Sequence, residues 1–423
     1  MPAATSAAAS SRPRVAVTAG LRGASWAPQR MELPFQARPC PLTTQDGQAV
    51  QGLLYSRGPS RKVVFLMHPR EFIATHYLVP DVLDAGWACW VQGARSIGND
   101  LRLEHEFAVH DVAAGMLHLR TLGFETVVLL GNSGGAGLFA FYNQQSLLSP
   151  AQRILRTPAG RPTALDTATL PAADGVVLVS PHPGQGVLLM NALDPSVTDE
   201  SDPFSRDASL DPFSAANGFR APPESSRYGA DFVARYRAAQ RDRVACLDAR
   251  ALALVEQKQA ARGRYKTSRD AQDKTLASHG AIFTVWRTDA DLRCWDLALD
   301  PSDRLVGSLW GADPVVSNLG SVGFGRVVTP ESWLSTWSGL SSNASMQKCA
   351  ASIEQPALLV EYSGDNCVFP ADVDAIYAGM RTSRKERHRV RGNHHGQPLD
   401  DGEESGQVIA GCHLSRWLAE TFA

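Results

Sequence analysis

Short, almost wholly apolar runs alternate with helical periodicity in the first half of the chain. The runs cover residues 50–55, 62–67, 87–91, 127–130 and 176–179, and the helical patterns cover about 71–85, 104–122 and 136–147. The run 50–55 is interrupted by Gln51 and Gly52, which indicates an edge strand. The other runs are typical of parallel strands that are buried on both faces. We therefore expect an α/β fold with a doubly wound, mostly parallel sheet.

The alternation stops after Ser180 and resumes with an apolar run at 357–362. A helix near 371–380, a strand near 386–391 and a helix at 405–421 follow. The interval between is expected to be a large, mainly helical insertion with a long helix near 228–262. The predicted organisation is a flexible tail at 1–30, a first core part at 31–190, the insertion at 191–349 and a second core part at 350–423.

The insertion holds five of the nine tryptophans of the chain. They are Trp286, Trp295, Trp310, Trp333 and Trp337. A single tryptophan there is best explained by packing within the insertion. Because aromatic side chains commonly line ligand pockets, we expect at least one of them to contact a substrate. The candidates are Trp310, Trp333 and Trp337.

Composition narrows the range of partners. The chain has 423 residues, of which 44% are hydrophobic and 20% charged, and its formal net charge is −2. It has no long run of like charges, so neither nucleic acid nor an anionic membrane is expected as a partner. No stretch of 18 apolar residues predicts a membrane span, and the N-terminal region has no apolar secretory core. A cytoplasmic protein acting on a small molecule is expected, and a homo-oligomer is left open.

The seven cysteines are scattered and form no C-x-x-C pair. This pattern favours a reducing compartment and argues against a structural zinc site.

The segment TVVLLGNSGGAG carries the strongest chemical signal. Gly131, Ser133 and Gly135 form G-x-S-x-G directly after the strand-like run 127–130 and before the helical run that begins at Ala136. A sharp strand-to-helix turn crowds its backbone, so glycines flank the serine, whose hydroxyl projects from the tip. Ser133 is therefore predicted to be a nucleophile.

A serine nucleophile needs a base and an acid that orients the base. Asp365 follows the apolar run 357–362 in the loop SGDNCVFP, where the carboxyl ends of parallel strands share one sheet edge. Asp194 and Asp199, one strand earlier, are the alternative acids.

The base is expected from RGNHHG, which follows the last predicted strand. Only one of the adjacent His394 and His395 can serve. The turn at Gly392-Asn393 and the following Gly396 favour His395.

Donors for a developing oxyanion are expected from two loops. One is the backbone N–H of Gly134, directly after the nucleophile. The other belongs to the loop HPREF after the run 62–67. Pro69 has no N–H, so Arg70 or Glu71 is the expected donor. The Arg70 side chain is predicted either to attract an anionic substrate group or to form a surface salt bridge.

At these residues the chain resembles the α/β-hydrolase superfamily. GNSGG is similar to the nucleophile turn, SGDNCVFP to the acid loop, GNHHG to the histidine loop and LMHPR to the oxyanion loop. The resemblance covers 31–190 and 350–423. It implies Ser133 as nucleophile, His395 as base, Asp365 as acid, and Gly134 with Arg70 as oxyanion donors. The insertion then corresponds to the lid of these enzymes.

The chain departs from the family pattern at His68-Pro69, where many members have His-Gly, and in the 232 residues that separate Ser133 from Asp365 (365 − 133). The elbow predicts fold and nucleophile, but a fold does not name a reaction.

The expected function is hydrolysis of a carboxylic ester, thioester or amide of a medium-sized, partly apolar molecule, with no metal or organic cofactor. The alternative within the same triad is a C–C bond hydrolase acting on a diketone-type ring-cleavage product, for which Arg70 would bind a carboxylate. A dinucleotide-binding loop fits poorly, because Ser133 occupies the second glycine position of G-x-G-x-x-G. A non-enzymatic binding protein of this fold is the remaining alternative.

Overall fold

The computed structural model describes residues 34–321 and 323–423. The tail predicted for residues 1–30 lies outside this range.

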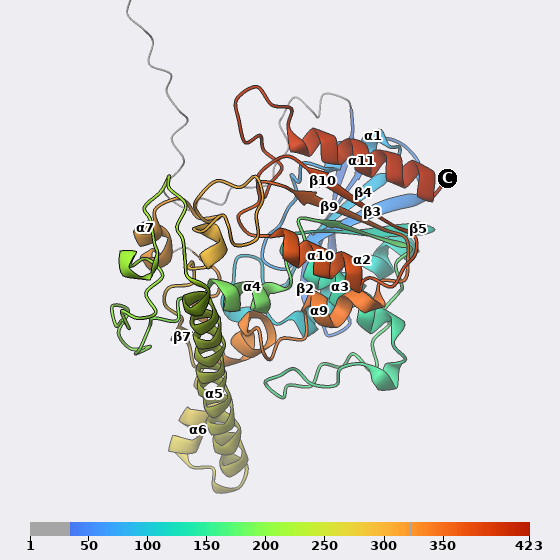
Figure 1. The fold of residues 1–423 in the computed structure, drawn as a ribbon. Coiled ribbons are helices and arrows are strands. Elements are labelled where there is room, and N and C mark those ends of the chain that lie inside the picture. The colour runs from blue at the N-terminus through green and yellow to red at the C-terminus, as the bar shows by residue number, and fades with distance from the viewer. Residues whose placement is uncertain (1–33, 322) are drawn as a thin grey trace, which may run out of the picture.

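The described chain forms one large sheet of eight strands (Figure 1). The strands are β1 (Gln36–Thr43), β2 (Ala49–Ser56), β3 (Lys62–His68), β4 (Ala88–Gly93), β5 (Thr126–Asn132), β6 (Gly175–Val179), β9 (Ala357–Tyr362) and β10 (Lys385–Val390). Their spatial order is β1-β2-β4-β3-β5-β6-β9-β10. The first two pairs are antiparallel and all others are parallel. The doubly wound sheet expected from the apolar runs is confirmed.

Helices cover both faces of the sheet. They are α1 (Val79–Asp84), α2 (His105–Thr121), α3 (Gly134–Leu147), α10 (Pro370–Gly379) and α11 (Gly406–Thr421). Side chains alternate between the faces of a strand, so Phe65 of β3 packs with α2 and α3, whereas Leu66 packs with α1 and α11. This packing buries the strands on both sides and leaves their carboxyl ends to carry functional loops.

Two local predictions need correction. The run 50–55 was expected at the sheet edge, but β1 pairs along the whole of β2 and takes that place. The helix expected at 71–85 forms only from Val79 to Asp84, with Pro80 in its first turn. Proline fits the first turn of a helix because its ring fixes φ and it lacks an N–H. The preceding residues form an irregular loop beside Ser133.

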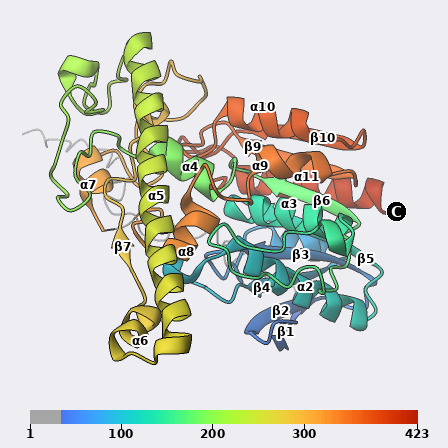
Figure 2. The same ribbon diagram turned by 90° about the horizontal axis from the view of Figure 1, so that it is seen from below.

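The chain between β6 and β9 forms a large insertion, whose first helix begins before the predicted bound at 191. Its elements are α4 (Gln185–Ala192), α5 (Ala230–Ser268), α6 (Ala271–Ser278), β7 (Phe283–Thr284), α7 (Pro314–Leu319), β8 (Val327–Val328), α8 (Pro330–Ser332) and α9 (Met346–Cys349), with a π-helical turn at Trp333–Trp337. The long helix α5 stands at one side of the sheet, and α6 folds back on its end (Figures 1 and 2). The strand pair β7–β8 is separate from the main sheet. Among the described helices, none combines the length and apolar character that a membrane crossing requires.

Candidate active site

Ser133 lies in the turn between β5 and α3. Its backbone has φ 52° and ψ −117°, a conformation that L-residues rarely adopt and that costs of the order of 1–3 kcal/mol. A Cβ at Gly131 would lie 2.5 Å from the Ala136 nitrogen, and one at Gly135 would lie 2.4 Å from the Met67 carbonyl oxygen. Both neighbours are backbone atoms that cannot move aside. The glycines of G-x-S-x-G are therefore required by close approach.

A buried histidine and a buried aspartate form a hydrogen-bonded series with Ser133. The Nε2 atom of His394 lies 3.0 Å from Ser133 Oγ, and its Nδ1 lies 2.7 Å from Asp365 Oδ2. The other carboxylate oxygen of Asp365 accepts the backbone N–H groups of Cys367 and Val368, at 2.7 and 3.0 Å. These bonds fix the carboxylate, which then orients the imidazole.

The prediction of His395 as the partner of Ser133 is wrong. Asn393 Oδ1 accepts the backbone N–H of His395 at 3.0 Å and that of Gln397 at 3.1 Å. This side-chain turn directs His394 inward. The His395 ring contacts the His394 ring, with centroids 4.9 Å apart, and forms part of the cavity wall.

The alternative acids lie elsewhere. Asp194 is buried in the insertion, where Oδ1 accepts the Ser196 N–H and Oδ2 accepts the side-chain amide of Asn318. Asp199 is exposed. Neither is paired with His394.

Arg70 does not have the position expected of it. Its backbone N–H donates to His68 Nδ1 at 3.2 Å, so this amide is directed into its own loop. Its guanidinium forms two 2.8 Å hydrogen bonds to Asp100 and lies over the rings of Phe324 and Trp337. The expectation of an Arg70 oxyanion amide is thereby corrected. The side chain instead joins the sheet to the insertion.

A cavity of about 80 Å³ opens beside Ser133. Its apolar wall comes from Ile73, Leu309, Trp310 and Phe324, and its polar wall from His68, Arg70, Glu71, Asn132, His182, Gln185, His394 and His395. Of the three candidate tryptophans, Trp310 lines it. Trp333 is fully buried and donates its ring N–H to Asp248, while Trp337 is buried against Arg70 and Phe324. These two tryptophans pack the insertion.

His68, His182 and Gln185 were not among the predicted site residues. His68 ends β3, and the segment SPHPG that carries His182 follows β6, so both stand at the carboxyl edge of the sheet. That placement was a usable signal, because ligands bind at this edge of such sheets.

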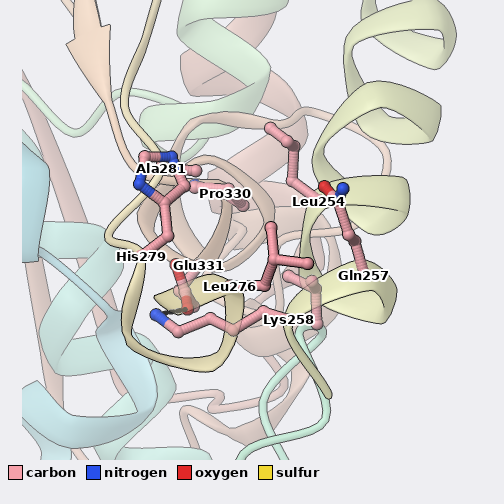
Figure 3. Close-up of a pocket in the computed structure, with 9 residues that line it drawn as sticks. Leu254, Gln257, Lys258, Leu276, His279, Ala281, Pro330 and Glu331 are labelled. Atoms are coloured by element: carbon pink, nitrogen blue, oxygen red, sulfur yellow. Dashed lines mark ion pairs between the residues drawn. The ribbon is translucent and has the colours of Figure 1, made fainter. Parts of the chain in front are cut away.

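A separate hollow lies between α5, α6 and α8 (Figure 3). It shares no residue with the cavity at Ser133, and its ion pair, Lys258 to Glu331 at 4.0 Å, is partly exposed. Such a pair contributes little to stability or binding. Within the described residues, no group of three or more His, Cys, Asp or Glu side chains is arranged to hold a metal ion.

No protein-family model and no curated protein matches this chain. Solved structures are similar in fold. The esterase Pf2001 of Pyrococcus furiosus is 12% identical, with a TM-score of 0.44 over 94% of this chain and 95% of its own. The α/β hydrolase GrgF of a Penicillium species is 12% identical, with a TM-score of 0.45 over 92% and 100%. DcsB, solved with a substrate analogue, is 12% identical, with a TM-score of 0.49 over 91% and 100%.

Likeness at this level concerns the fold and does not extend to substrate. The structure itself shows an α/β fold with a doubly wound, mostly parallel sheet, Ser133 in a strand–turn–helix position, and a large helical insertion between β6 and β9. The fold expected from the sequence is confirmed.

Proposed function

We propose that the protein is a serine hydrolase that cleaves carboxylic esters through an acyl-enzyme on Ser133. The observation that carries this proposal is the continuous hydrogen-bonded series from Asp365 through His394 to Ser133. His394 accepts the hydroxyl proton as Ser133 Oγ attacks the carbonyl carbon, and the alcohol leaves with that proton. Water then adds to the acyl-enzyme with His394 again as base.

The cavity favours a short acyl group. Its 80 Å³ is well below the roughly 300–1,000 Å³ of pockets for drug-sized ligands. Ile73, Leu309, Trp310 and Phe324 give it an apolar side. A small, partly apolar acid fits this space, whereas a longer chain requires displacement of the insertion residues that cover Ser133.

The structure gives no support to the alternative of a C–C bond hydrolase. It relied on Arg70 as the partner of a substrate carboxylate, but that guanidinium is already paired with both oxygens of Asp100. No observation at the site favours a diketone over an ester.

Hydrolysis of p-nitrophenyl esters from acetate to dodecanoate tests the proposal. We expect the highest kcat/KM at short chains and a loss of about 10⁶-fold in kcat in Ser133→Ala, because the attack then lacks its nucleophile. Circular dichroism shows whether the variant is folded. Equal ester hydrolysis by wild type and folded Ser133→Ala would contradict the proposal.

A further inference from the structure

Three side-chain nitrogens surround the residue that follows the nucleophile. A Cβ added at Gly134 would lie 2.7 Å from Gln185 Nε2, 2.8 Å from His68 Nε2 and 3.3 Å from His182 Nε2. Both histidines are more than nine-tenths buried, and both line the cavity together with Ser133. Both imidazole rings therefore lie beside Gly134, whose backbone N–H is the expected oxyanion donor.

Backbone amides select the tautomer of each ring. The Arg70 N–H donates to His68 Nδ1 at 3.2 Å, and the Gly184 N–H donates to His182 Nδ1 at 3.1 Å. A ring nitrogen that accepts a hydrogen bond carries no proton, so the proton of the neutral ring is on Nε2. Both rings thus present an N–H group at Nε2.

Burial keeps both rings neutral. It lowers the pKa of His68 well below its ordinary value and that of His182 to about 3, and the neighbouring Arg70 and His394 act in the same direction. Neither ring has a carboxylate partner like the one that Asp365 provides for His394. Their Nε2 atoms, already protonated, are not suited to act as a general base.

The Nε2–H groups have no acceptor within the described residues. Both residues line the cavity, so their Nε2–H groups can stabilise an oxygen that accumulates negative charge there. In the loop after β3, Pro69 has no N–H and the Arg70 N–H is directed to His68, so neither of these two residues offers a backbone donor to the oxyanion. A side-chain donor compensates for both losses.

We propose that His68 and His182, through Nε2–H, are oxyanion donors that act together with the backbone N–H of Gly134. This role rests on the proposed attack by Ser133. As Oγ bonds to the carbonyl carbon, the π electron pair moves onto the carbonyl oxygen and the serine proton passes to His394. The two rings keep their protons and only donate hydrogen bonds. When the C–O bond to the alcohol breaks, the carbonyl re-forms.

The test replaces each donor by an aromatic ring of similar size. His68→Phe and His182→Phe are expected to lower kcat for p-nitrophenyl acetate by about 10²–10³-fold each, with KM within a few-fold, because the lost bond forms in the transition state. His68→Gln and His182→Gln, which keep an N–H, should recover part of the loss. His279→Phe, an exposed histidine next to α6, is the matched control.

A comparison of two substrates distinguishes an oxyanion-donor role of His68 and His182 from a merely structural one. The thiono ester, whose C=S sulfur accepts hydrogen bonds weakly, should be hydrolysed far more slowly than the oxo ester by wild type. The Phe variants should lose most of this discrimination. Unchanged kcat and unchanged discrimination in both folded Phe variants would overturn the inference. Ser133→Ala separates the two proposals. If hydrolysis depends on Ser133 but is unchanged in both histidine variants, this inference is wrong and the proposed function stands.

If the Phe variants do not fold, an NMR experiment on the wild-type protein still tests the donor role. Phenylboronic acid adds to Ser133 and places an oxygen where the oxyanion forms. The ¹⁵N-imidazole Nε2–H signals of His68 and His182 should then move downfield in NMR spectra. Binding of the boronic acid without movement of either signal would contradict the donor role.

Discussion

The sheet and the insertion are stabilised by different forces. The strands β3, β5, β6 and β9 are buried almost without exception and consist mainly of aliphatic residues. The insertion has two smaller apolar clusters and also contains buried charged side chains. Asp291 pairs with Arg237 and Arg293 at 2.7 and 2.8 Å. The strands around Ser133 therefore rest mainly on apolar packing, whereas the insertion combines apolar packing with buried ion pairs.

The two regions meet at the loop that carries Asp365. Arg293 of the insertion pairs with Asp372 of α10 at 2.9 Å. The side-chain amide of Asn366 donates to the Leu305 carbonyl at 2.8 Å, and Cys294 Sγ donates to the Asn366 carbonyl at 3.3 Å. The orientation of the acid therefore depends on the charged region as well as on the sheet.

The largest changes in the free energy of unfolding should come from removing one side chain in the insertion and one in the sheet. Asp291→Ala leaves the partly buried guanidinium groups of Arg237 and Arg293 without their shared carboxylate, although Arg293 keeps Asp372, and we expect a loss of about 1.5–3 kcal/mol in the free energy of unfolding. Leu129→Ala, at a fully buried position of β5, should cost about 2–5 kcal/mol through lost burial and a cavity. Denaturant unfolding at pH 7 measures both.

The matched control is Asp242→Ala, at an exposed position of α5, which should change the free energy of unfolding by less than about 0.5 kcal/mol. An Asp291→Ala effect no larger than the control would show that the ion pairs do not stabilise the insertion.

Acid should reduce the destabilisation caused by Asp291→Ala and leave that caused by Leu129→Ala unchanged. Burial alone would raise the pKa of Asp291, but the charges of Arg237 and Arg293 outweigh it and hold the pKa below its ordinary value. A lowered folded-state pKa gives stability that is present above the unfolded pKa near 3.8 and is lost as pH falls through the folded value. The cost of Asp291→Ala should therefore shrink below about pH 4. The cost of Leu129→Ala should not; parallel pH profiles would contradict this account.

A smaller effect of opposite sign is expected at Glu104, at the start of α2. Burial raises its pKa to about 7, even though Arg161 is its ion-pair partner, and Oε2 has no partner within the described residues. Between about pH 4.5 and 7 the folded protein binds a proton that the unfolded chain does not, so stability falls as pH rises. Glu104→Gln should remove about 1–2 kcal/mol of this decline. Thermal unfolding at pH 5 and pH 8 measures it, and an equal decline in the variant would exclude Glu104 as its source.

The parallel strands and the helices α2 and α3 could be predicted because each leaves a local pattern. An apolar run marks 127–130 as a buried strand, and the crowding of a strand-to-helix turn explains the glycines around Ser133. The strand β1 could not be predicted in this way. Its sequence QARPCPLT is largely exposed, and it forms by pairing with β2.

The sequence could not predict that His394 is the histidine that contacts Ser133, and the reason is related. His394 and His395 share their neighbours and composition, and the choice between them depends on the Asn393 side chain that binds the amides of His395 and Gln397. The packing role of Trp333 and Trp337 depends likewise on contacts with Asp248 and Arg70, distant in sequence.

In the proposed mechanism, Ser133 is activated by His394 and not by its neighbour His395. Fluorophosphonate labelling, followed by peptide mass spectrometry, tests it in wild type, His394→Ala and His395→Ala. Labelling at Ser133 should be about 10⁴-fold slower in His394→Ala and remain within about tenfold of wild type in His395→Ala. Loss of labelling in His395→Ala, with retention in His394→Ala, would contradict the account.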